Sequence, residues 1–447
     1  METIHIYHTN DLHSHFENWP RIHQLLTKRV KWHKEAGEQV FLFDIGDHID
    51  LSHPYTEAFK GKGNTRLLNE TCYTAVTIGN NEGITLPFSD LNTLYNHAQF
   101  DVILANLYTR QNERPNWAQP YHLYTTRTGL TVGVIGLTAY FSLLYQLLGW
   151  KLTDPLLELK KQIAAIKEKA DVIILLSHLG VHDDEQIAAD FPEIDVILGA
   201  HTHHIFHEGK LIHDCLLGAA GKFGMYVGHI ILTYDPLEKR IKQKKAQLYK
   251  TSELPPANKE QEWLEKITLQ GKQQLSDYIT TVSPHYTCKT ILAQLLCDAL
   301  YEWCDADCAL LNEGVILHDL SPGEVTRYDI LSICPHPINP CVVRLSGAEL
   351  KEVVRQSLDG KWNDMQIMGL GFRGKLMGKM VTTAIEKDNA RYKIDGNEII
   401  NDDFYKLAIP DMFTFGRFFP AIFRAEKKQY YLPEFLREIL AWKLKQL

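Results

Sequence analysis

The chain has no run of apolar residues long enough to cross a bilayer. Its first residues turn polar at once, without the apolar stretch and small-residue cleavage site of a secretory signal peptide. No later stretch approaches the ~20 apolar residues that a transmembrane helix needs. The sequence therefore predicts no membrane association and a cytoplasmic location.

Cysteine is also scarce, with 8 residues in a chain of 447 and no CxxC pair. Paired cysteines at short spacing are typical of zinc sites and redox motifs, so neither is indicated here. We expect the thiols to be reduced and to act as small apolar residues in the interior of a cytosolic protein.

The chain has no excess of positive charge either. It contains 47 Lys and Arg residues and 55 Asp and Glu residues, which gives a net charge of -8. Non-specific binding to a polynucleotide requires a positive surface, so a nucleic-acid partner is disfavoured. A small anionic substrate remains compatible with this balance, since bound metal ions can supply local positive charge. No repeat or low-complexity tract interrupts the sequence, whose length predicts two or three globular domains.

The first half of the chain is organised as short apolar runs separated by longer segments of mixed character. Their length, β-branched content and flanking turn residues predict strands, and their alternation with longer segments is typical of a layered α/β domain. The predicted strands are Ile4–Tyr7, Val40–Phe43, Thr74–Ile78, Val102–Leu104, Val132–Ile135, Val172–Leu176 and Val196–Leu198.

Five of these seven runs are followed by Asp, Asn or His side chains. Each short motif alone is common in turns and helix caps, but the carboxyl ends of strands in such a sheet meet at one edge, where the side chains would converge. Carboxylates, amides and neutral imidazoles are ligands for Mn, Zn, Fe or Mg. The residues are Asp11 and His13, Asp47 and His48, Asn80 and Asn81, His178, and finally His201 and His203.

The ordered set NDLH, GD, GNN, SHLG and GAHTH resembles the motifs of the calcineurin-like metallophosphoesterases. More narrowly it is similar to the 5′-nucleotidase family, in its cytoplasmic bacterial branch. The resemblance implies an α/β fold, a four-layer αββα sandwich followed by a smaller α+β domain.

The resemblance also implies two divalent metal ions, with Asp47 bridging them. A metal pair of this kind can align a bridging hydroxide for attack on phosphorus and neutralise the developing charge. The implied ligands are Asp11, His13, Asp47 and His203 for one ion, and Asp47, Asn80, His178 and His201 for the other.

One motif departs from the family. Where the family has a histidine and an aspartate that assist the leaving group, this chain has Asn81 and Ile84. An amide cannot act as a general acid near neutral pH. Three explanations stay open: a substrate with a good leaving group, another histidine in the role, with His48 first and His15 and His53 as alternatives, or a site that only binds.

A second domain follows a boundary marked by two consecutive prolines. We expect a metallophosphoesterase domain over residues 1–250, a linker with a long helix over 251–283, and a C-terminal 5′-nucleotidase-type domain over 284–447. The resemblance places substrate-binding residues in that last domain. Asn312 matches the family motif, and Phe413 or Phe415 could stack on a base, although core packing is the commoner role of such aromatics.

Three functional hypotheses follow. The first is a hydrolase of a small phosphate ester, a nucleotide or a related phosphodiester or pyrophosphate. The second is a catalytically impaired protein that binds metal and nucleotide. The third is a nuclease, which the acidic balance disfavours. The sequence leaves metal identity and oligomeric state open.

Overall fold

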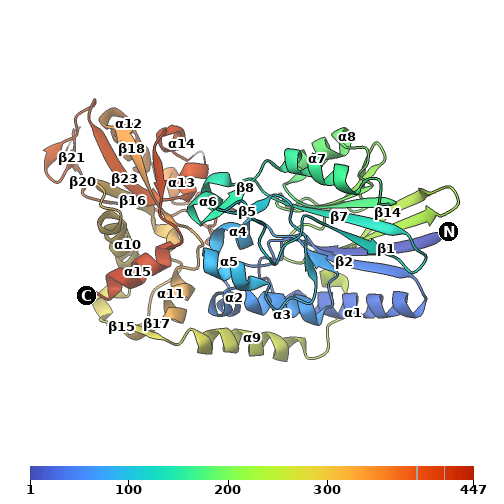
Figure 1. Ribbon diagram of the computed structural model, residues 1–447. Helices are drawn as coiled ribbons and strands as arrows, with labels where there is room; N and C mark the ends of the chain where they lie inside the picture. Colours follow the sequence, from blue (N-terminus) through green and yellow to red (C-terminus); the bar gives the residue numbers. More distant parts are fainter. Residues whose placement is uncertain (389–390, 417) are drawn as a thin grey trace. The chain divides into compact units, whose positions relative to one another are not determined.

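The computed structural model of the protein describes residues 1–388, 391–416 and 418–447. The chain divides into two compact units, Met1–Gly271 and Lys272–Leu447 (Figure 1). Helix α9, Glu260–Gln274, crosses this boundary in the sequence and lies within the stretch for which the sequence predicts a helix.

The first unit contains two six-stranded sheets. The strand order is β14-β13-β1-β2-β3-β4 in one sheet and β11-β12-β10-β9-β7-β6 in the other. In the first sheet the strands are β1 Glu2–Thr9, β2 Gln39–Asp44, β3 Ala75–Val76, β4 Asp101–Val102, β13 Tyr226–Asp235 and β14 Arg240–Lys250. In the second sheet they are β6 Tyr121–Thr125, β7 Thr131–Thr138, β9 Val172–His178, β10 Val196–Gly199, β11 Lys210–Ile212 and β12 Cys215–Gly218. A short pair, β5 Leu107–Thr109 and β8 Trp150–Leu152, stands apart from both sheets.

A strand is present at each of the seven predicted runs. Strands β1 to β4 are parallel to one another, and so are β7, β9, β10 and β12. The two sheets share a core in which Ile4 and Ile6 of β1 are buried together with Val132 and Val134 of β7. Because side chains alternate along a strand, the intervening residues of β1 face away from this core.

Helices cover the outer faces of both sheets, so the first unit has four layers (Figure 1). Leu159 and Ile163 of α7 pack with Ile173 and Leu175 of β9, while α1 contacts β2 of the other sheet. This arrangement confirms the αββα sandwich implied by the resemblance. The helices of this unit are α1 Trp19–Glu35, α2 Pro54–Phe59, α3 Lys62–Glu70, α4 Asn80–Thr85, α5 Phe88–Leu94, α6 Ser142–Leu147, α7 Pro155–Ile166 and α8 Val181–Asp190.

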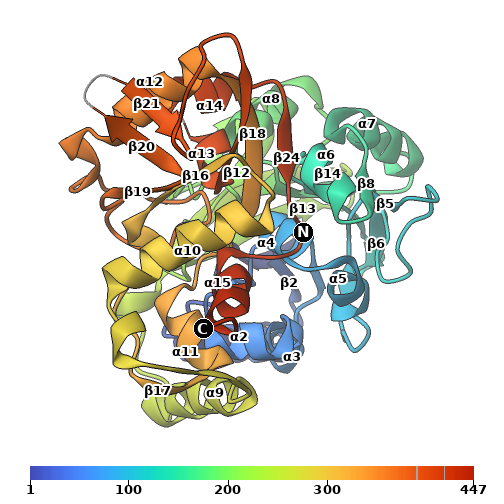
Figure 2. The same cartoon turned by 90° about the vertical axis from the view of Figure 1, so that its left-hand side faces the viewer.

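The second unit is built on a five-stranded mixed sheet of order β19-β16-β23-β18-β24. Helix α10 packs against β16 and β19 and lies beside α15 (Figure 2). The sheet strands are β16 Cys308–Asn312, β18 Pro340–Ser346, β19 Met380–Thr383, β23 Phe404–Pro410 and β24 Lys428–Tyr430. Five further strands are β15 Tyr278–Val282, β17 Gly323–Thr326, β20 Ile385–Asp388, β21 Arg391–Ile394 and β22 Asn397–Glu398. The helices are α10 Lys289–Trp303, α11 Arg327–Ile333, α12 Gly347–Ser357, α13 Met412–Phe415, α14 Pro420–Arg424 and α15 Leu436–Leu444.

Two expectations about composition can be compared with the structure. Within the described ranges, no helix combines the length and the apolar character that crossing a membrane requires. All eight cysteines are free thiols; Cys72 and Cys288 are exposed and the others are buried.

Candidate metal centre

The structure brings the predicted metal-ligating side chains into two adjoining groups. Asp11, His13 and His203 form one group, and Asp47, His178 and His201 form the other, with the donor atoms of each group within 4.8 Å of one another. The residues come from the three loops that follow β1, β2 and β10 and from the last residue of β9. Parallel strands deliver all of them to one edge because their carboxyl ends point the same way.

The carboxylate of Asp47, which belongs to the second group, also faces His13 of the first. Its Oδ2 atom is 3.7 Å from Nε2 of His13 and 3.4 Å from Nε2 of His178. On the other side, Oδ1 of Asp11 is 3.5 Å from Nε2 of His203. With metal bonds of about 2.0–2.2 Å, two donors on one ion stand roughly 3.3–3.8 Å apart. These distances are therefore those expected for donors that flank an ion.

The backbone at these loops is unusual. Five of the seven predicted ligands, Asp11, His13, Asp47, His201 and His203, have φ between 49° and 70°. A positive φ is uncommon for residues with a Cβ and costs of order 1–3 kcal/mol, so it persists where the surrounding structure enforces it. The fold therefore holds these five candidate ligands in a conformation that their own residue types disfavour.

Glycine makes the approach of these loops possible. A Cβ on Gly79 would lie 2.1 Å from Oδ1 of Asp47 and 2.5 Å from Cε1 of His178. A Cβ on Gly46, whose φ is +87°, would lie 2.2 Å from the backbone nitrogen of Gly79. The loops after β2 and β3 can therefore meet only because both positions lack side chains.

Glu82 joins the same two loops, and the sequence analysis did not assign it a role. Its carboxylate accepts hydrogen bonds from the backbone N–H groups of Asp47 at 2.9 Å, Ile49 at 3.0 Å and Gly79 at 2.8 Å. The side chain is 1% exposed. The sequence signal for this capping role is the GNNE motif. Glu82 stands in it three residues after Gly79, the N-cap residue of helix α4.

Hydrogen bonds behind the site orient two of the candidate ligands. Nδ1 of His178 donates to the carbonyl of Ile45 at 2.7 Å, which directs Nε2 towards Asp47. Nδ2 of Asn10 donates to Oδ2 of Asp11 at 2.8 Å and to the carbonyl of Gly221 at 2.7 Å. Such outer partners fix the direction in which a ligand presents its lone pair.

Burial and neighbouring charges shift the pKa values of several groups in the site. Burial works against a charge on His178, but the carboxylates of Asp47 and Asp11 outweigh it and raise the pKa of His178 to about 10. Burial and then the charge of Asp47 raise the pKa of Glu82 to about 7, and burial lowers the pKa of His201 to about 4. Bound cations would take the place of protons as the partners of these carboxylates.

The residues present fit a divalent cation. Carboxylate, imidazole and amide donors converge at a buried position, which is the ligand chemistry of first-row transition ions. Asn80 stands at the start of α4, and its Oδ1 is buried without a hydrogen-bond partner among the described residues. The buried Nε2 of His178 likewise has no such partner within the described part of the chain. A metal ion would satisfy both atoms.

The predicted catalytic candidates have other surroundings. The side-chain amide of Asn81 lies 2.8 Å from Nδ1 of His13 and donates to the carbonyl of Ile49 at 3.1 Å. His48 is 3% exposed; its ring lies edge-on to Trp19 and its Nδ1 is 3.1 Å from the amide of Asn64. Asn81 therefore contacts a candidate ligand. The described contacts of the His48 ring are with two buried residues, Trp19 and Asn64.

The two alternative histidines also have identifiable contacts. His15 is paired with Glu17 at 2.7 Å, and its ring is tilted against that of Phe223 at a centroid distance of 3.8 Å. His53 is the N-cap of α2, where its Nδ1 accepts a hydrogen bond from Tyr55 N. Capping gives His53 a structural role that does not require chemistry.

A loop that the sequence analysis did not single out borders the metal centre. The backbone N–H of Phe223 donates to the carbonyl of Asp11 at 2.7 Å, and its ring lies edge-on to His13 at 5.8 Å. Nζ of Lys222 lies 4.6 Å from the centroid of the same ring. No metal-binding pattern marks this loop in the sequence, so only the fold reveals its position.

The candidate substrate residues lie in the second unit and differ in exposure. Asn312 ends β16, is fully buried, and donates from Nδ2 to the carbonyl of Met377 at 3.0 Å. Phe413 is also fully buried and packs in the core of this unit against Phe419. Phe415 is 40% exposed and stacks on Tyr430 at a centroid distance of 5.9 Å. Of the two phenylalanines, only Phe415 presents a ring surface to solvent.

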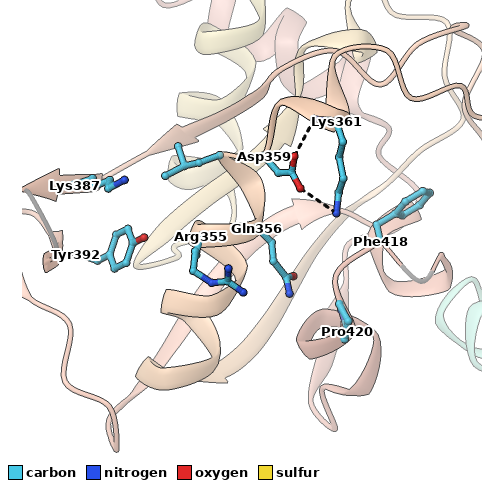
Figure 3. A pocket seen from close by; sticks show the side chains of 9 residues that line it. Arg355, Gln356, Asp359, Lys361, Lys387, Tyr392, Phe418 and Pro420 are labelled. Carbon is cyan, nitrogen blue, oxygen red and sulfur yellow. Dashed lines mark hydrogen bonds and ion pairs between the residues drawn. The ribbon is translucent and has the colours of Figure 1, made fainter.

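A hollow of about 630 Å³ lies elsewhere in the second unit (Figure 3). It is lined by basic and aromatic side chains, including Arg355, Lys361 and Tyr392. The charge of Arg355 is paired with Glu352, and that of Lys361 with Asp359. Neither Asn312 nor Phe415 is among its lining residues, so this hollow is separate from the predicted substrate residues.

Comparisons with known proteins agree with this geometry. Residues 4–204 match the family model "calcineurin-like phosphoesterase", and residues 271–418 match "5'-nucleotidase, C-terminal domain". The uncharacterized metallophosphoesterase YunD of Bacillus subtilis is 42% identical over 100% of both chains. A 5'-nucleotidase of Vibrio cholerae is 24% identical over 92% of this chain and 84% of its own length.

Solved structures share the fold across the whole chain. A putative 5'-nucleotidase of Staphylococcus aureus, solved with alpha-ketoglutarate, superimposes with a TM-score of 0.69 at 18% identity, covering 100% of this chain and 97% of that one. The NAD nucleotidase of Haemophilus influenzae gives a TM-score of 0.68 at 17% identity, covering 99% and 96%. The full-length relationship at 42% identity is what establishes the family. The chain belongs to the calcineurin-like metallophosphoesterases that carry a 5′-nucleotidase C-terminal domain, and it is a metal-dependent hydrolase of phosphoesters.

Proposed function

We propose that the protein hydrolyses phosphoesters of nucleotides or related phosphodiester and pyrophosphate compounds, using two divalent ions bridged by Asp47. The observation that supports this proposal is the position of Asp47, whose Oδ2 faces His13 at 3.7 Å and His178 at 3.4 Å. Asn80 would complete one ion's ligands, and Asp11 and His203 those of the other.

The side chains of the centre have distinct roles in this proposal. Two divalent ions held by these residues would supply positive charge for the phosphate oxygens and would lower the pKa of the attacking water. Asp47 holds the two ligand groups together, and Glu82 fixes the loop on which Asp47 lies through three backbone hydrogen bonds. His178 is oriented by the carbonyl of Ile45, so it presents Nε2 to the centre.

The direct test is hydrolysis of an activated aryl phosphodiester by the full chain loaded with Mn²⁺. Asp47→Asn should lower kcat more than about 100-fold, because losing even an outer partner of a ligand typically costs 10–100-fold. The exposed Asp183→Asn, which makes the same chemical change on α8, should leave kcat unchanged. Equal activity of the Asp47 variant and the wild type would refute the bridging role.

The nucleotide part of the proposal rests on the second unit. Residues 271–418 match the 5'-nucleotidase C-terminal domain, and Phe415 stacked on Tyr430 offers a partly exposed aromatic surface for a base. Base stacking on an aromatic ring contributes roughly 1–3 kcal/mol. A screen of mononucleotides, dinucleotides, cyclic nucleotides and nucleotide sugars with metal-loaded protein would identify the preferred substrate.

A second candidate function is binding of metal and nucleotide without turnover. It is favoured by Asn81, which supplies an amide in contact with His13 where the family has a catalytic histidine. General-acid catalysis contributes typically 10²–10⁴-fold, so its loss alone slows hydrolysis without abolishing it. Stoichiometric metal binding with no cleavage of any phosphoester in the screen would support this second function and exclude the first.

A further inference from the structure

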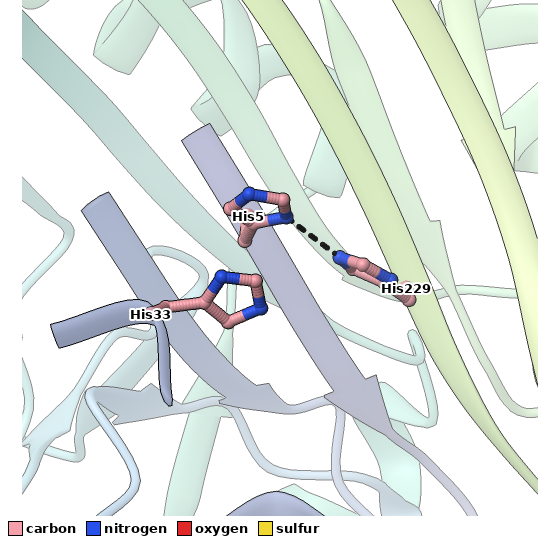
Figure 4. A group of neighbouring side chains, drawn as sticks. All are labelled: His5, His33 and His229. Atoms are coloured by element: carbon pink, nitrogen blue, oxygen red, sulfur yellow. Dashed lines mark hydrogen bonds between the residues drawn. The ribbon is translucent and has the colours of Figure 1, made fainter. Parts of the chain in front are cut away.

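A separate cluster of titratable side chains lies in the first unit. It contains His5, His33 and His229, which Figure 4 shows, and Glu38. His5 lies on β1, His33 near the end of α1, and His229 on β13. The donor atoms of the three histidines are within 4.8 Å of one another, and the residues are 8%, 1% and 4% exposed. Ile4 and Ile6 face the core between the sheets, so His5 faces the opposite side of β1.

The carboxylate of Glu38 faces two of these imidazoles at once. Its Oε2 atom is 2.7 Å from Nδ1 of His33 and 3.4 Å from Nε2 of His5. Nε2 of His5 is buried and lacks a hydrogen-bond partner among the residues that the structure describes. The side chain of Glu38 is 37% exposed, so this corner of the cluster is open to solvent.

The other ring nitrogens of both imidazoles are already engaged. Nδ1 of His5 lies 3.0 Å from Nε2 of His229, and Nε2 of His33 lies 2.9 Å from the hydroxyl of Tyr7. A metal-binding histidine commonly donates its second N–H to a protein group, which fixes the tautomer and the ring orientation. In this cluster Nε2 of His5 and Nδ1 of His33 are the ring nitrogens that face Glu38. For Nε2 of His5 to bind a metal, His229 must carry its proton on Nδ1, and the amide of Gln247, whose Nε2 lies 2.9 Å from that atom, must turn to present its oxygen.

We propose that this cluster binds one further divalent transition-metal ion, such as Zn²⁺, through Nε2 of His5, Nδ1 of His33 and the carboxylate of Glu38. Two imidazoles and one carboxylate form a ligand set that zinc accepts in proteins. The separation of 3.4 Å between His5 and Glu38 already suits two donors on one ion. The rings of His5 and His33 are stacked at 3.8 Å, an arrangement in which both lone pairs cannot reach one ion, so the proposal requires one ring to rotate and the ion to replace the hydrogen bond between His33 and Glu38.

The charge around the cluster is compatible with one cation. Arg29 contributes positive charge nearby, but its guanidinium lies over the rings of Trp32 and Tyr249, at 5.5 and 5.1 Å. The single carboxylate of Glu38 supplies the negative charge. The site shares no residue with the groups around Asp11 and Asp47, so it stands or falls independently of the proposed hydrolytic function.

The test is the zinc content of the full chain after stripping with chelator, reloading and desalting, measured by elemental analysis. We expect the wild type and Glu35→Gln, a matched loss of charge on the exposed end of α1, to hold one more ion per chain than Glu38→Gln. Phosphoesterase activity of all three proteins should be the same. Equal zinc content in the three proteins would overturn the proposal.

A second measurement needs no variant and covers the case in which Glu38→Gln fails to fold. Zinc-loaded crystals of the wild type should give an anomalous difference peak between Glu38, His5 and His33 at the zinc absorption edge. Peaks at the centre around Asp47 with none at Glu38 would overturn this inference and leave the proposed function intact. A peak at Glu38 with none around Asp47 would support this inference and would overturn the metal centre of the proposed function.

Discussion

At the level of single residues, Asn81 contacts two of the proposed metal ligands, His13 and Asp47. Its side-chain amide bridges His13 and the carbonyl of Ile49, and its backbone N–H donates to Oδ1 of Asp47 at 2.7 Å. The side chain therefore holds a ligand in place. This positioning role is one that an amide can perform without exchanging protons.

Asn81→Ala should consequently raise the Mn²⁺ concentration needed for half-maximal activity by about 10–100-fold, the usual effect of losing a partner behind a ligand. Activity at saturating Mn²⁺ should recover more fully than activity at limiting Mn²⁺. The matched control is Asn112→Ala on an exposed turn, which should leave the titration unchanged. An unaltered Mn²⁺ requirement in the Asn81 variant would contradict the role.

Phe415 is the residue on which nucleotide selectivity should depend. Phe415→Ala should raise KM for the preferred nucleotide by roughly 5–100-fold, corresponding to the loss of base stacking, with little change in kcat. KM for an aryl phosphodiester without a base should be unaffected. Phe404→Ala, which removes another exposed aromatic ring of the second unit, serves as the control. A similar change in KM for both substrates would argue against stacking.

At the scale of the element, the centre depends on the close approach of the loops after β2 and β3. Gly79→Ala would place a Cβ 2.1 Å from Oδ1 of Asp47, so the loops must separate. We expect loss of metal binding and a decrease of about 1–3 kcal/mol in the free energy of unfolding, as for other overpacked sites. Gly360→Ala is the control, because nothing lies within 4 Å of its added Cβ. Chemical denaturation and metal analysis distinguish the outcomes.

The same elements show what can be predicted from sequence. The seven strands were predictable because each is a short β-branched run, and the position of the ligands follows from the shared direction of parallel strands. The strand β3 is shorter than its predicted run Thr74–Ile78, because the chain turns into α4 at Asn80. The bridging position of Glu82 depends on three backbone groups from two loops, which periodicity does not encode.

In the second unit, the sequence does not predict which aromatic side chains are exposed to solvent. The two phenylalanines Phe413 and Phe415 alternate in the sequence, and α13 buries one and leaves the other partly exposed. Which ring faces solvent depends on packing against Phe419 and Tyr430, which come from later parts of the chain. The roles of the metal-ligating, catalytic and substrate-binding residues stay predictions, as do the two boundaries between the three segments and the cytoplasmic location.

At the scale of the whole molecule, buried histidines couple folding to pH. His8 of β1 is fully buried, and burial lowers its pKa to about 4. The unfolded chain binds a proton on this side chain below pH 6.5, whereas the folded chain does so only below about 4. The contribution of His8 to stability is therefore present above pH 6.5 and is lost as the pH falls towards 4.

We expect the wild type to lose about 2 kcal/mol more unfolding free energy than His8→Gln when the pH drops from 7.5 to 5.0, at 1.36 kcal/mol per pH unit. This difference is measured by urea unfolding of the metal-free full chain, using the unfolding transition of the first unit, which contains His8. His97→Gln, at an exposed histidine, should behave like the wild type. Parallel pH dependence of the wild type and the His8 variant would contradict the assignment.

Electron paramagnetic resonance of the Mn²⁺-loaded full chain distinguishes two ions joined by one carboxylate from two separate ions. Two Mn²⁺ ions bridged by Asp47 at roughly 3.5–4 Å should give the spectrum of a spin-coupled pair. Asp47→Asn should convert it to the signal of isolated ions. A wild-type spectrum that shows only isolated, uncoupled Mn²⁺ at full loading would contradict the account.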